Sequence, residues 1–236
     1  MDNITMKTQH TGKVYLVGGG PGNPDLLTLR AARLIAEAEV LVYDNLIGAD
    51  IIALAPAKSE RIYVGKESAK HTLPQEQINV LLVSLAQTGR NVVRLKGGDP
   101  FMFGRGGEEI ETLVAHGIAF EVVPGVSAAL GMAAYTGIPL THRDFAQTCV
   151  FATGHLKDGS CDLDWQALAR PRQTLVIYMG VSQAAYIQHG LLSGLFASIL
   201  EVIVQNTSLP HQRHAVTILG SLQHTIHHEQ LGSPAV

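Results

Sequence analysis

The sequence has little cysteine and no long apolar segment. Cys149 and Cys161 are its two cysteines and form no CxxC pair, which argues against a disulfide scaffold or a thiolate zinc site and suits a reducing compartment. The least charged stretch, 122–140, is interrupted by Pro124 and Pro139 and is a poor membrane span. Residues 1–12 are polar and lack the apolar region of a secretory signal. We expect a cytoplasmic protein with a flexible tail over 1–12 and no membrane partner.

A strong charge of either sign is also missing. The formal net charge is −3, from 17 Lys and Arg against 20 Asp and Glu, with no basic block. Nucleic-acid binding therefore has little electrostatic support, and a small-molecule ligand fits better. Several histidines near the end lack ligand spacing with a partner acid, so we expect no metal site; they are His211, His214, His224, His227 and His228.

Short apolar runs that alternate with helical patterns dominate the first half. This alternation predicts an α/β fold with a parallel sheet. The expected helices are Leu26–Ala38, Gln75–Gln87 and Glu108–His116, and the expected strands are Val14–Val17, Val40–Tyr43, Arg61–Val64, Val92–Leu95 and Phe120–Val123. Asp44, Lys66 and the 97–100 loop follow strand ends, where ligands of such sheets bind.

A turn at Pro124-Gly125 predicts a hinge between an N-terminal α/β domain over 13–124 and a C-terminal α/β domain over 125–236. The expected elements beyond it are a helix at Ser127–Tyr135, strands at Cys149–Ala152, Thr174–Tyr178 and Glu201–Val204, and a hairpin-like strand within His211–Leu222. We expect residues 224–236 to form a polar end.

Two glycine-rich loops are candidate ligand sites. Gly18–Gly22 follows the first strand, and a dinucleotide interpretation would use Asp44 as the ribose-binding acid, although Pro21 interrupts direct entry into a helix. A structural turn fits this loop equally well. The segment 92–109 holds five glycines around Lys96, Asp99 and Arg105. Such clustering indicates close backbone approach to a ligand, with a long surface loop as the alternative.

The chain resembles the tetrapyrrole methylases, and within them the uroporphyrinogen-III C-methyltransferases, from about residue 13 to about 222. Six ordered segments carry the resemblance: VYLVGGGPGNPDLLTLRA, VYDNLI, VGK, VVRLKGGDPFMFGRGGEE, VVPGVSAALGMAAYTGIPLTHRDFAQTCVFATGH and LVIYMG. The resemblance implies two α/β domains with the active site in the trough between them, as a homodimer. It also implies two methyl transfers from S-adenosyl-L-methionine to uroporphyrinogen III, giving precorrin-2 by way of precorrin-1, for sirohaem and cobalamin, with S-adenosyl-L-homocysteine as the other product.

The same resemblance assigns roles to residues of the matched motifs. Asp44 and Lys66 take the places of the proton acceptor and donor. The cofactor-contacting places are Pro21, Gly97, Gly98, Asp99, Ser127, Ala128, Met179 and Thr207. Cationic donors for the carboxylates of the substrate are expected at Arg105, His142, Arg143 and His155, each of which could form an internal salt bridge instead.

Other functions stay open from the sequence alone. A methyltransferase for another corrinoid precursor is the nearest, followed by a nicotinamide-dependent dehydrogenase and a binding protein that has lost turnover. The pattern also departs from the resemblance at the end, because relatives continue past Ser233–Val236 into an apolar strand. We therefore expect a sheet margin there with unpaired backbone groups.

Overall fold

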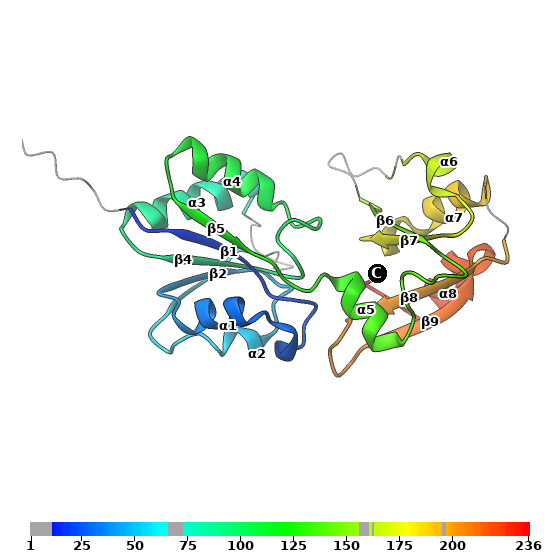
Figure 1. Cartoon of the computed structure of the whole chain (residues 1–236), viewed down its shortest axis with the longest axis horizontal. Coiled ribbons are helices and arrows are strands. Elements are labelled where there is room, and N and C mark those ends of the chain that lie inside the picture. Colours follow the sequence, from blue (N-terminus) through cyan, green and yellow to red (C-terminus); the bar gives the residue numbers. More distant parts are fainter. Residues whose placement is uncertain (1–10, 66–72, 156–160, 162, 195–196) are drawn as a thin grey trace, which may run out of the picture. The chain divides into compact units, whose positions relative to one another are not determined.

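The structure is a computed structural model that describes residues 11–65, 73–155, 161, 163–194 and 197–236. The chain divides into two compact units, Met1–Val126 and Ser127–Val236. Each unit has its own sheet and its own helices, and the two are described separately below (Figure 1).

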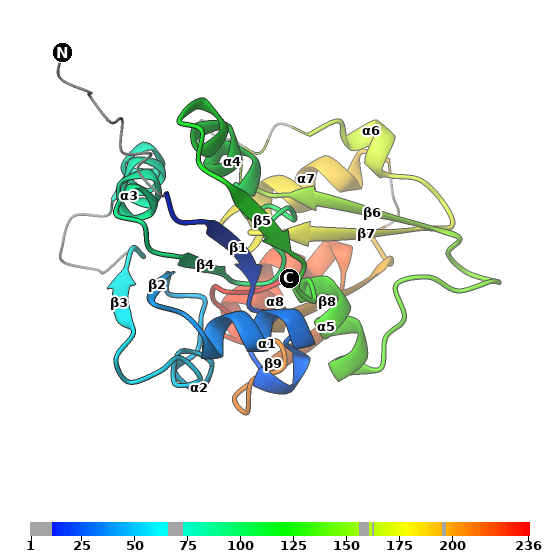
Figure 2. The ribbon, with the colours of Figure 1, turned by 60° about the vertical axis from the view of Figure 1, so that its left-hand side comes forward.

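A five-stranded parallel sheet forms the centre of the first unit, as the sequence predicts. Its strands are β1 (Val14–Gly18), β2 (Val40–Tyr43), β3 (Glu60–Tyr63), β4 (Val92–Lys96) and β5 (Phe120–Val123). They lie in the order β3-β2-β4-β1-β5 (Figure 2). All paired strands run in the same direction, so the segments that follow β1, β2 and β4 leave the same edge of the sheet.

Helices cover both faces of this sheet (Figure 1). They are α1 (Leu29–Ala36), α2 (Ala49–Ile52), α3 (Gln75–Gln87) and α4 (Gly106–Ala115). Alternate residues of β4 point to opposite faces of the sheet. Val92 packs with α3 and α4 on one face, whereas Val93 and Leu95 pack with α1 and α2 on the other. This two-sided burial explains why the strands read as continuous apolar runs in the sequence.

Two predicted helix boundaries are wrong by a few residues. Helix α1 begins at Leu29 rather than Leu26, because the Thr28 hydroxyl accepts the Ala31 N–H (3.2 Å) as a cap, and a separate 3₁₀ turn occupies Pro24–Leu26. Helix α4 begins at Gly106 rather than Glu108. A local cap, which apolar periodicity does not register, sets the start of α1, whereas α4 follows Arg105, which has a left-handed backbone and makes no side-chain cap.

The second unit holds two small sheets. Strands β6 (Thr148–Thr153) and β7 (Gln173–Tyr178) pair in parallel, and β8 (Leu200–Gln205) and β9 (Arg213–Ile218) pair antiparallel. Its helices are α5 (Ala128–Thr136), α6 (Trp165–Leu168), α7 (Ala184–Leu192) and α8 (Leu222–His228), with 3₁₀ turns at Val181–Gln183 and Leu219–Ser221. Its core includes Ile187, Leu191, Ile203, Leu219 and Leu222.

The C-terminal segment adds a helix that the sequence did not predict, and it corrects one expectation. Residues 222–228 form α8, with Leu222 buried in the core. The free edge of β8 is also occupied, since Val204 and Val236 exchange N–H···O bonds of 2.8 and 3.0 Å and Asn206 donates to the Pro234 carbonyl (3.0 Å). Backbone pairing needs no particular side chains, so the short segment 234–236 protects an edge that we expected to be bare.

Among the described residues, no helix combines the length and the hydropathy needed to cross a lipid bilayer.

Candidate active site

The two glycine-rich loops of the first unit meet at the carboxyl edge of its sheet. Gly20 and Gly98 exchange backbone hydrogen bonds of 3.1 and 2.7 Å. A Cβ on Gly18 would lie 2.5 Å from the Gly125 nitrogen, and one on Gly125 would lie 2.2 Å from the Gly98 carbonyl oxygen. Gly98 also has a φ of +65°, which favours glycine. Backbone packing among three segments therefore explains several of these glycines without a ligand.

The carboxylate of Asp99 closes the second loop. Its Oδ1 accepts the Phe101 N–H (2.8 Å) and its Oδ2 accepts the Gly125 N–H (3.0 Å). One oxygen thus closes the loop on itself, and the other joins the loop to the end of the first unit. Pro21 follows the Gly20–Gly98 contact and is half-buried, and Gly97 packs its backbone against Leu46. The N–H and C=O of Gly98 are both bonded to Gly20, and the Asp99 side chain has a structural role.

In the second unit, Tyr178 ties the start of α5 to the end of β7. Its hydroxyl lies 2.5 Å from the Ser127 Oγ and accepts the Ala129 N–H (3.0 Å). Ser127 is buried, and Ala128 is the first residue of α5. Met179 directly follows Tyr178. It has a φ of +56° and is 44% exposed. A left-handed backbone at a bulky residue is uncommon and costs conformational energy.

Thr207 lies in a tight turn after β8. It is 6% exposed, and its neighbours Asn206 and Ser208 both have positive φ, at 55° and 65°. Left-handed residues on both sides fix the course of the backbone at this point. The structure thus places the matched residues in two groups, with Pro21, Gly97, Gly98 and Asp99 in the first unit and Ser127, Ala128, Met179 and Thr207 in the second.

Asp44 follows β2 at the carboxyl edge of the first sheet. Its Oδ1 accepts the Leu46 N–H (3.1 Å), which is the turn-forming contact of an ordinary loop acid. Its Oδ2 accepts a 3.2 Å hydrogen bond from Nη2 of Arg94, and its side chain is 22% exposed. Asp44 is therefore both a turn residue and a fixed carboxylate that reaches solvent. Its expected partner Lys66 lies outside the described residues.

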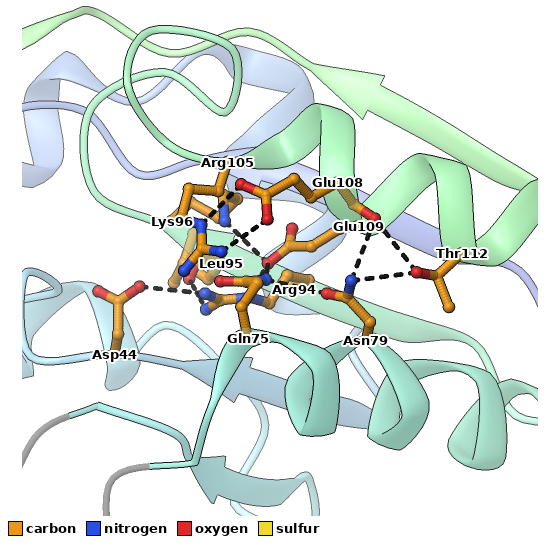
Figure 3. Close-up of polar contacts among 10 residues, drawn as sticks. All are labelled: Asp44, Gln75, Asn79, Arg94, Leu95, Lys96, Arg105, Glu108, Glu109 and Thr112. Atoms are coloured by element: carbon orange, nitrogen blue, oxygen red, sulfur yellow. Dashed lines mark hydrogen bonds and ion pairs between the residues drawn. The ribbon is translucent and has the colours of Figure 1, made fainter. Parts of the chain in front are cut away.

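A buried charge cluster stands behind Asp44 (Figure 3). Oε1 of Glu109, on α4, accepts Arg94 Nε at 3.1 Å and Lys96 Nζ at 2.9 Å. The side chains of Arg94, Lys96 and Glu109 are 4%, 5% and 0% exposed. Burial, followed by the neighbouring Arg94 cation, lowers the pKa of Lys96, and the Glu109 carboxylate opposes that change.

The sequence-based reasoning missed this cluster. It placed Lys96 in the glycine loop only and assigned nothing to Arg94 or Glu109. The available signal was the spacing of two cations at i and i+2 in the otherwise apolar segment VVRLK. Residues at that spacing share one face of a strand, and a buried face with two cations requires an anion from a neighbouring element.

The four expected carboxylate-binding side chains are exposed. Arg105 already pairs with Glu108, three residues along, through 2.7 and 2.6 Å contacts, which favours the salt-bridge alternative for this residue. In the second unit, His142 packs its ring on Phe145, with centroids 4.7 Å apart, and Arg143 follows it in the same turn. The backbone N–H of His155 donates to the Thr153 hydroxyl (3.2 Å). Across the described residues, no three His, Cys, Asp or Glu side chains are grouped as a metal site would require.

A doubly covered parallel sheet, with glycine turns and a fixed carboxylate at its carboxyl edge, is typical of an α/β enzyme that binds a small molecule at this edge. Comparison with known proteins identifies the family. Residues 13–223 match the model of the Tetrapyrrole (Corrin/Porphyrin) Methylases, and the chain belongs to this family.

Relatives and solved structures agree with this membership. The siroheme synthase of Chromobacterium violaceum is 55% identical over 226 residues, which cover 95% of this chain and 48% of that protein; the chain thus spans about half the length of such curated relatives. The crystal structure of uroporphyrin-III C-methyl transferase from Thermus thermophilus, complexed with S-adenyl homocysteine, is 40% identical with a TM-score of 0.82, covering 95% of this chain and 90% of that one. A cobalt precorrin-4 methyltransferase, 24% identical with a TM-score of 0.83, shares the fold.

Proposed function

We propose that this chain is an S-adenosyl-L-methionine-dependent C-methyltransferase that converts uroporphyrinogen III to precorrin-2 by two successive methylations, through precorrin-1. The observation that carries the proposal is the likeness to the Thermus thermophilus enzyme, which spans 95% of this chain and includes both units. S-adenosyl-L-homocysteine is the second product. We further propose that the active site lies in the trough between the units, that the protein is cytoplasmic and that it acts as a homodimer.

Chemically, the two groups of matched residues suit the methyl donor. The Gly97-Gly98 turn, which has no side chains, lets a ligand approach the backbone closely beside the Gly20–Gly98 contact, and Pro21 follows Gly20 in the opposite loop. Ser127 and Thr207 carry buried hydroxyls, that of Ser127 bonded to the Tyr178 hydroxyl, and Met179 is a partly exposed residue with a left-handed backbone. Backbone approach at glycine and a few fixed polar groups are what a nucleoside with a charged amino-acid tail requires. We assign the contacts to Pro21, Gly97, Gly98, Asp99, Ser127, Ala128, Met179 and Thr207, with Asp99 acting through its loop.

S-adenosyl-L-methionine supplies an electrophilic methyl group, and the nucleophile is an electron-rich pyrrole carbon of the substrate. The work left to the chain is alignment and proton transfer. We assign the proton acceptor to Asp44, because its carboxylate is held by Arg94 yet reaches solvent at the sheet edge. Lys66 is proposed as the proton donor from the resemblance of the VGK motif alone.

The substrate carries several carboxylates, so exposed cationic donors suit its binding. We assign this role to Arg105, His142, Arg143 and His155. Arg105 would have to exchange Glu108 for a substrate carboxylate. The two side chains are 47% and 48% exposed, and exposed pairs of this kind contribute about 0–1 kcal/mol. The exchange therefore costs little.

Two alternative functions have less support. Activity on another corrinoid precursor would keep the same cofactor and the same fold. A nicotinamide-dependent dehydrogenase would need Asp44 for a ribose, whereas this carboxylate is engaged by Arg94 and the Leu46 N–H. The family match also favours a methyl donor over a dinucleotide.

Methyl transfer tests the proposal. Purified protein is incubated with S-adenosyl-L-methionine labelled in its methyl group and with enzymatically generated uroporphyrinogen III, and label in the tetrapyrrole fraction is counted. We expect transfer by the wild type and loss of at least about 100-fold in Asp44→Asn, since general base catalysis contributes about 10²–10⁴-fold. Calorimetric titration should show binding of S-adenosyl-L-homocysteine and none of NAD. Label-free tetrapyrrole, or binding of NAD alone, would contradict the proposal.

A further inference from the structure

The carboxylate assigned to proton transfer is the outermost member of a connected set of charges. Its side chain is 22% exposed, whereas Arg94 behind it is 4% exposed and Glu109 behind that is fully buried. Exposure thus decreases stepwise from the sheet edge into the space between β4, α3 and α4. A charge placed this deep has a strong influence on the geometry of its partners, since no water competes for their hydrogen bonds.

The guanidinium of Arg94 is fixed on three sides. Its Nε donates to Glu109 (3.1 Å), its Nη1 donates to the Leu95 carbonyl (3.0 Å) and its Nη2 donates to Asp44 (3.2 Å). Because the guanidinium is planar and rigid, fixing Nε fixes the direction of Nη2. The contact with Glu109 therefore determines where Arg94 can hold the carboxylate of Asp44 (Figure 3).

Glu109 is in turn held in place by α3. Gln75 donates from Nε2 to Oε1 of Glu109 (3.2 Å) and to Oδ1 of Asn79 (2.9 Å). Asn79 then donates to the Glu108 carbonyl (3.1 Å) and to the Thr112 hydroxyl (3.0 Å), which ties α3 to the backbone of α4. Oε1 of Glu109 receives Arg94, Lys96 and Gln75, while among the described residues Oε2 has no hydrogen-bond partner. A single oxygen atom, Oε1, thus accepts all the hydrogen bonds that the Glu109 side chain receives from these three residues.

We propose that Glu109 is a positioning residue, which fixes the Arg94 guanidinium so that Arg94 holds Asp44 in place for proton transfer. The inference rests on the proposed function, because that function gives Asp44 its role. Glu109 acts through Arg94 and is buried away from solvent, so loss of its charge changes the reaction step and leaves cofactor binding intact. Lys96 provides the second positive charge, which balances the two carboxylates.

A double-mutant cycle between Glu109 and Asp44 tests the proposal. The variants are Glu109→Gln, Asp44→Asn and the combination, assayed by steady-state methyl transfer to uroporphyrinogen III. We expect Glu109→Gln alone to lower kcat by about 10- to 100-fold, the usual effect of misplacing a reacting group. KM for the methyl donor and the Kd for S-adenosyl-L-homocysteine should stay unchanged. In the Asp44→Asn background the same substitution should change kcat by less than about 2-fold, because residues that act as a unit are not additive.

Glu121 provides a matched control, because this partly exposed carboxylate also pairs with two cations, Lys13 and Arg30. Glu121→Gln should leave kcat unchanged. Thermal unfolding shows whether each variant is folded. If Glu109→Gln does not fold, the cycle is run with Glu109→Asp, which keeps the charge and withdraws the carboxylate by one methylene group, and the same non-additive loss of kcat is expected.

The outcomes separate the inference from the proposed function. A wild type that transfers no methyl group to uroporphyrinogen III overturns the proposed function and the role of Asp44 with it. An active wild type in which the substitution at Glu109 costs the same factor in the native background and in the Asp44→Asn background overturns the inference alone. An unchanged kcat, or a loss confined to KM for the methyl donor, also overturns it.

Discussion

Two carboxylates of the first unit each bind two cations, one in the interior and one at the surface. Glu109 contacts Arg94 and Lys96 and is fully buried, whereas Glu121 contacts Lys13 and Arg30 with its side chain 30% exposed. Hydrogen bonding by Lys13 is the largest influence that lowers the pKa of Glu121. The composition of the two clusters is similar, so their difference isolates the effect of burial on a charged contact.

Burial has a larger effect on the free-energy cost of losing one partner of an ion pair than on the net stability that the intact pair contributes. At the surface, water replaces a lost partner, and a typical exposed pair contributes about 0–1 kcal/mol. In the interior no replacement is available, and an uncompensated charge must be accommodated or neutralised. An interior cluster is consequently a rigid support, which suits the role that we propose for Asp44.

The largest expected effect is a loss of stability when each of the two carboxylates is removed in turn. Glu109→Ala should lower the free energy of unfolding by about 3–5 kcal/mol, because it leaves two buried cations without their anion. Glu121→Ala should lower it by about 0–1 kcal/mol. Urea unfolding of the wild type and both variants measures the difference. Similar losses for the two variants would mean that burial of the Arg94–Glu109–Lys96 cluster has no special consequence.

A partly buried carboxylate without a cation extends the comparison. Glu201, on β8, makes no ion pair within the part of the chain that the structure describes, and burial raises its pKa to about 7. The folded protein therefore holds a proton on Glu201 that the unfolded chain releases near the ordinary value of 4.5. Stability from this site is complete below about pH 4.5 and is lost as the pH rises through about 7.

Glu201→Gln should remove this pH dependence. At pH 8 the variant should be more stable than the wild type by up to about 3 kcal/mol, and near pH 4.5 the two should be similar. Unfolding experiments between pH 4.5 and pH 9 check this expectation. A stability difference that is constant with pH would show that Glu201 does not titrate in this range.

The smallest expected effect concerns salt. Raising the ionic strength to about 1 M reduces the screening length to about 3 Å, so the contribution of Glu121 to stability should fall to near zero. The loss caused by Glu109→Ala should persist, because buried charges are poorly screened. Repeating the urea experiments at low and high salt measures both. An equal salt sensitivity at the two positions would contradict the separation into surface and interior clusters.

The sequence predicted the sheet well because its strands carry strong local signals. Continuous apolar runs that end in polar turns identified all five strands of the first unit to within a residue or two. Contacts between segments that lie far apart in the sequence were harder to predict. The pairing of Val204 with Val236 uses backbone groups, and no pattern of side chains indicates it.

The candidate site divides in the same way. Motifs located Asp44, the glycine turns and Met179, whereas the contacts of Glu109 with Arg94 and Lys96 depend on how α4 packs on β4. Asp99, a motif residue expected at the cofactor, also binds two backbone N–H groups of its own unit through its carboxylate. Sequence indicated which residues matter, and packing decided what each one contacts.

The mass of the tetrapyrrole product is the most direct test of the proposed function. Wild-type protein, uroporphyrinogen III and an excess of S-adenosyl-L-methionine should give a product that carries two additional methyl groups, preceded in time by a species with one. A substrate whose mass stays unchanged, under conditions in which the protein is folded and binds S-adenosyl-L-homocysteine, would contradict the account.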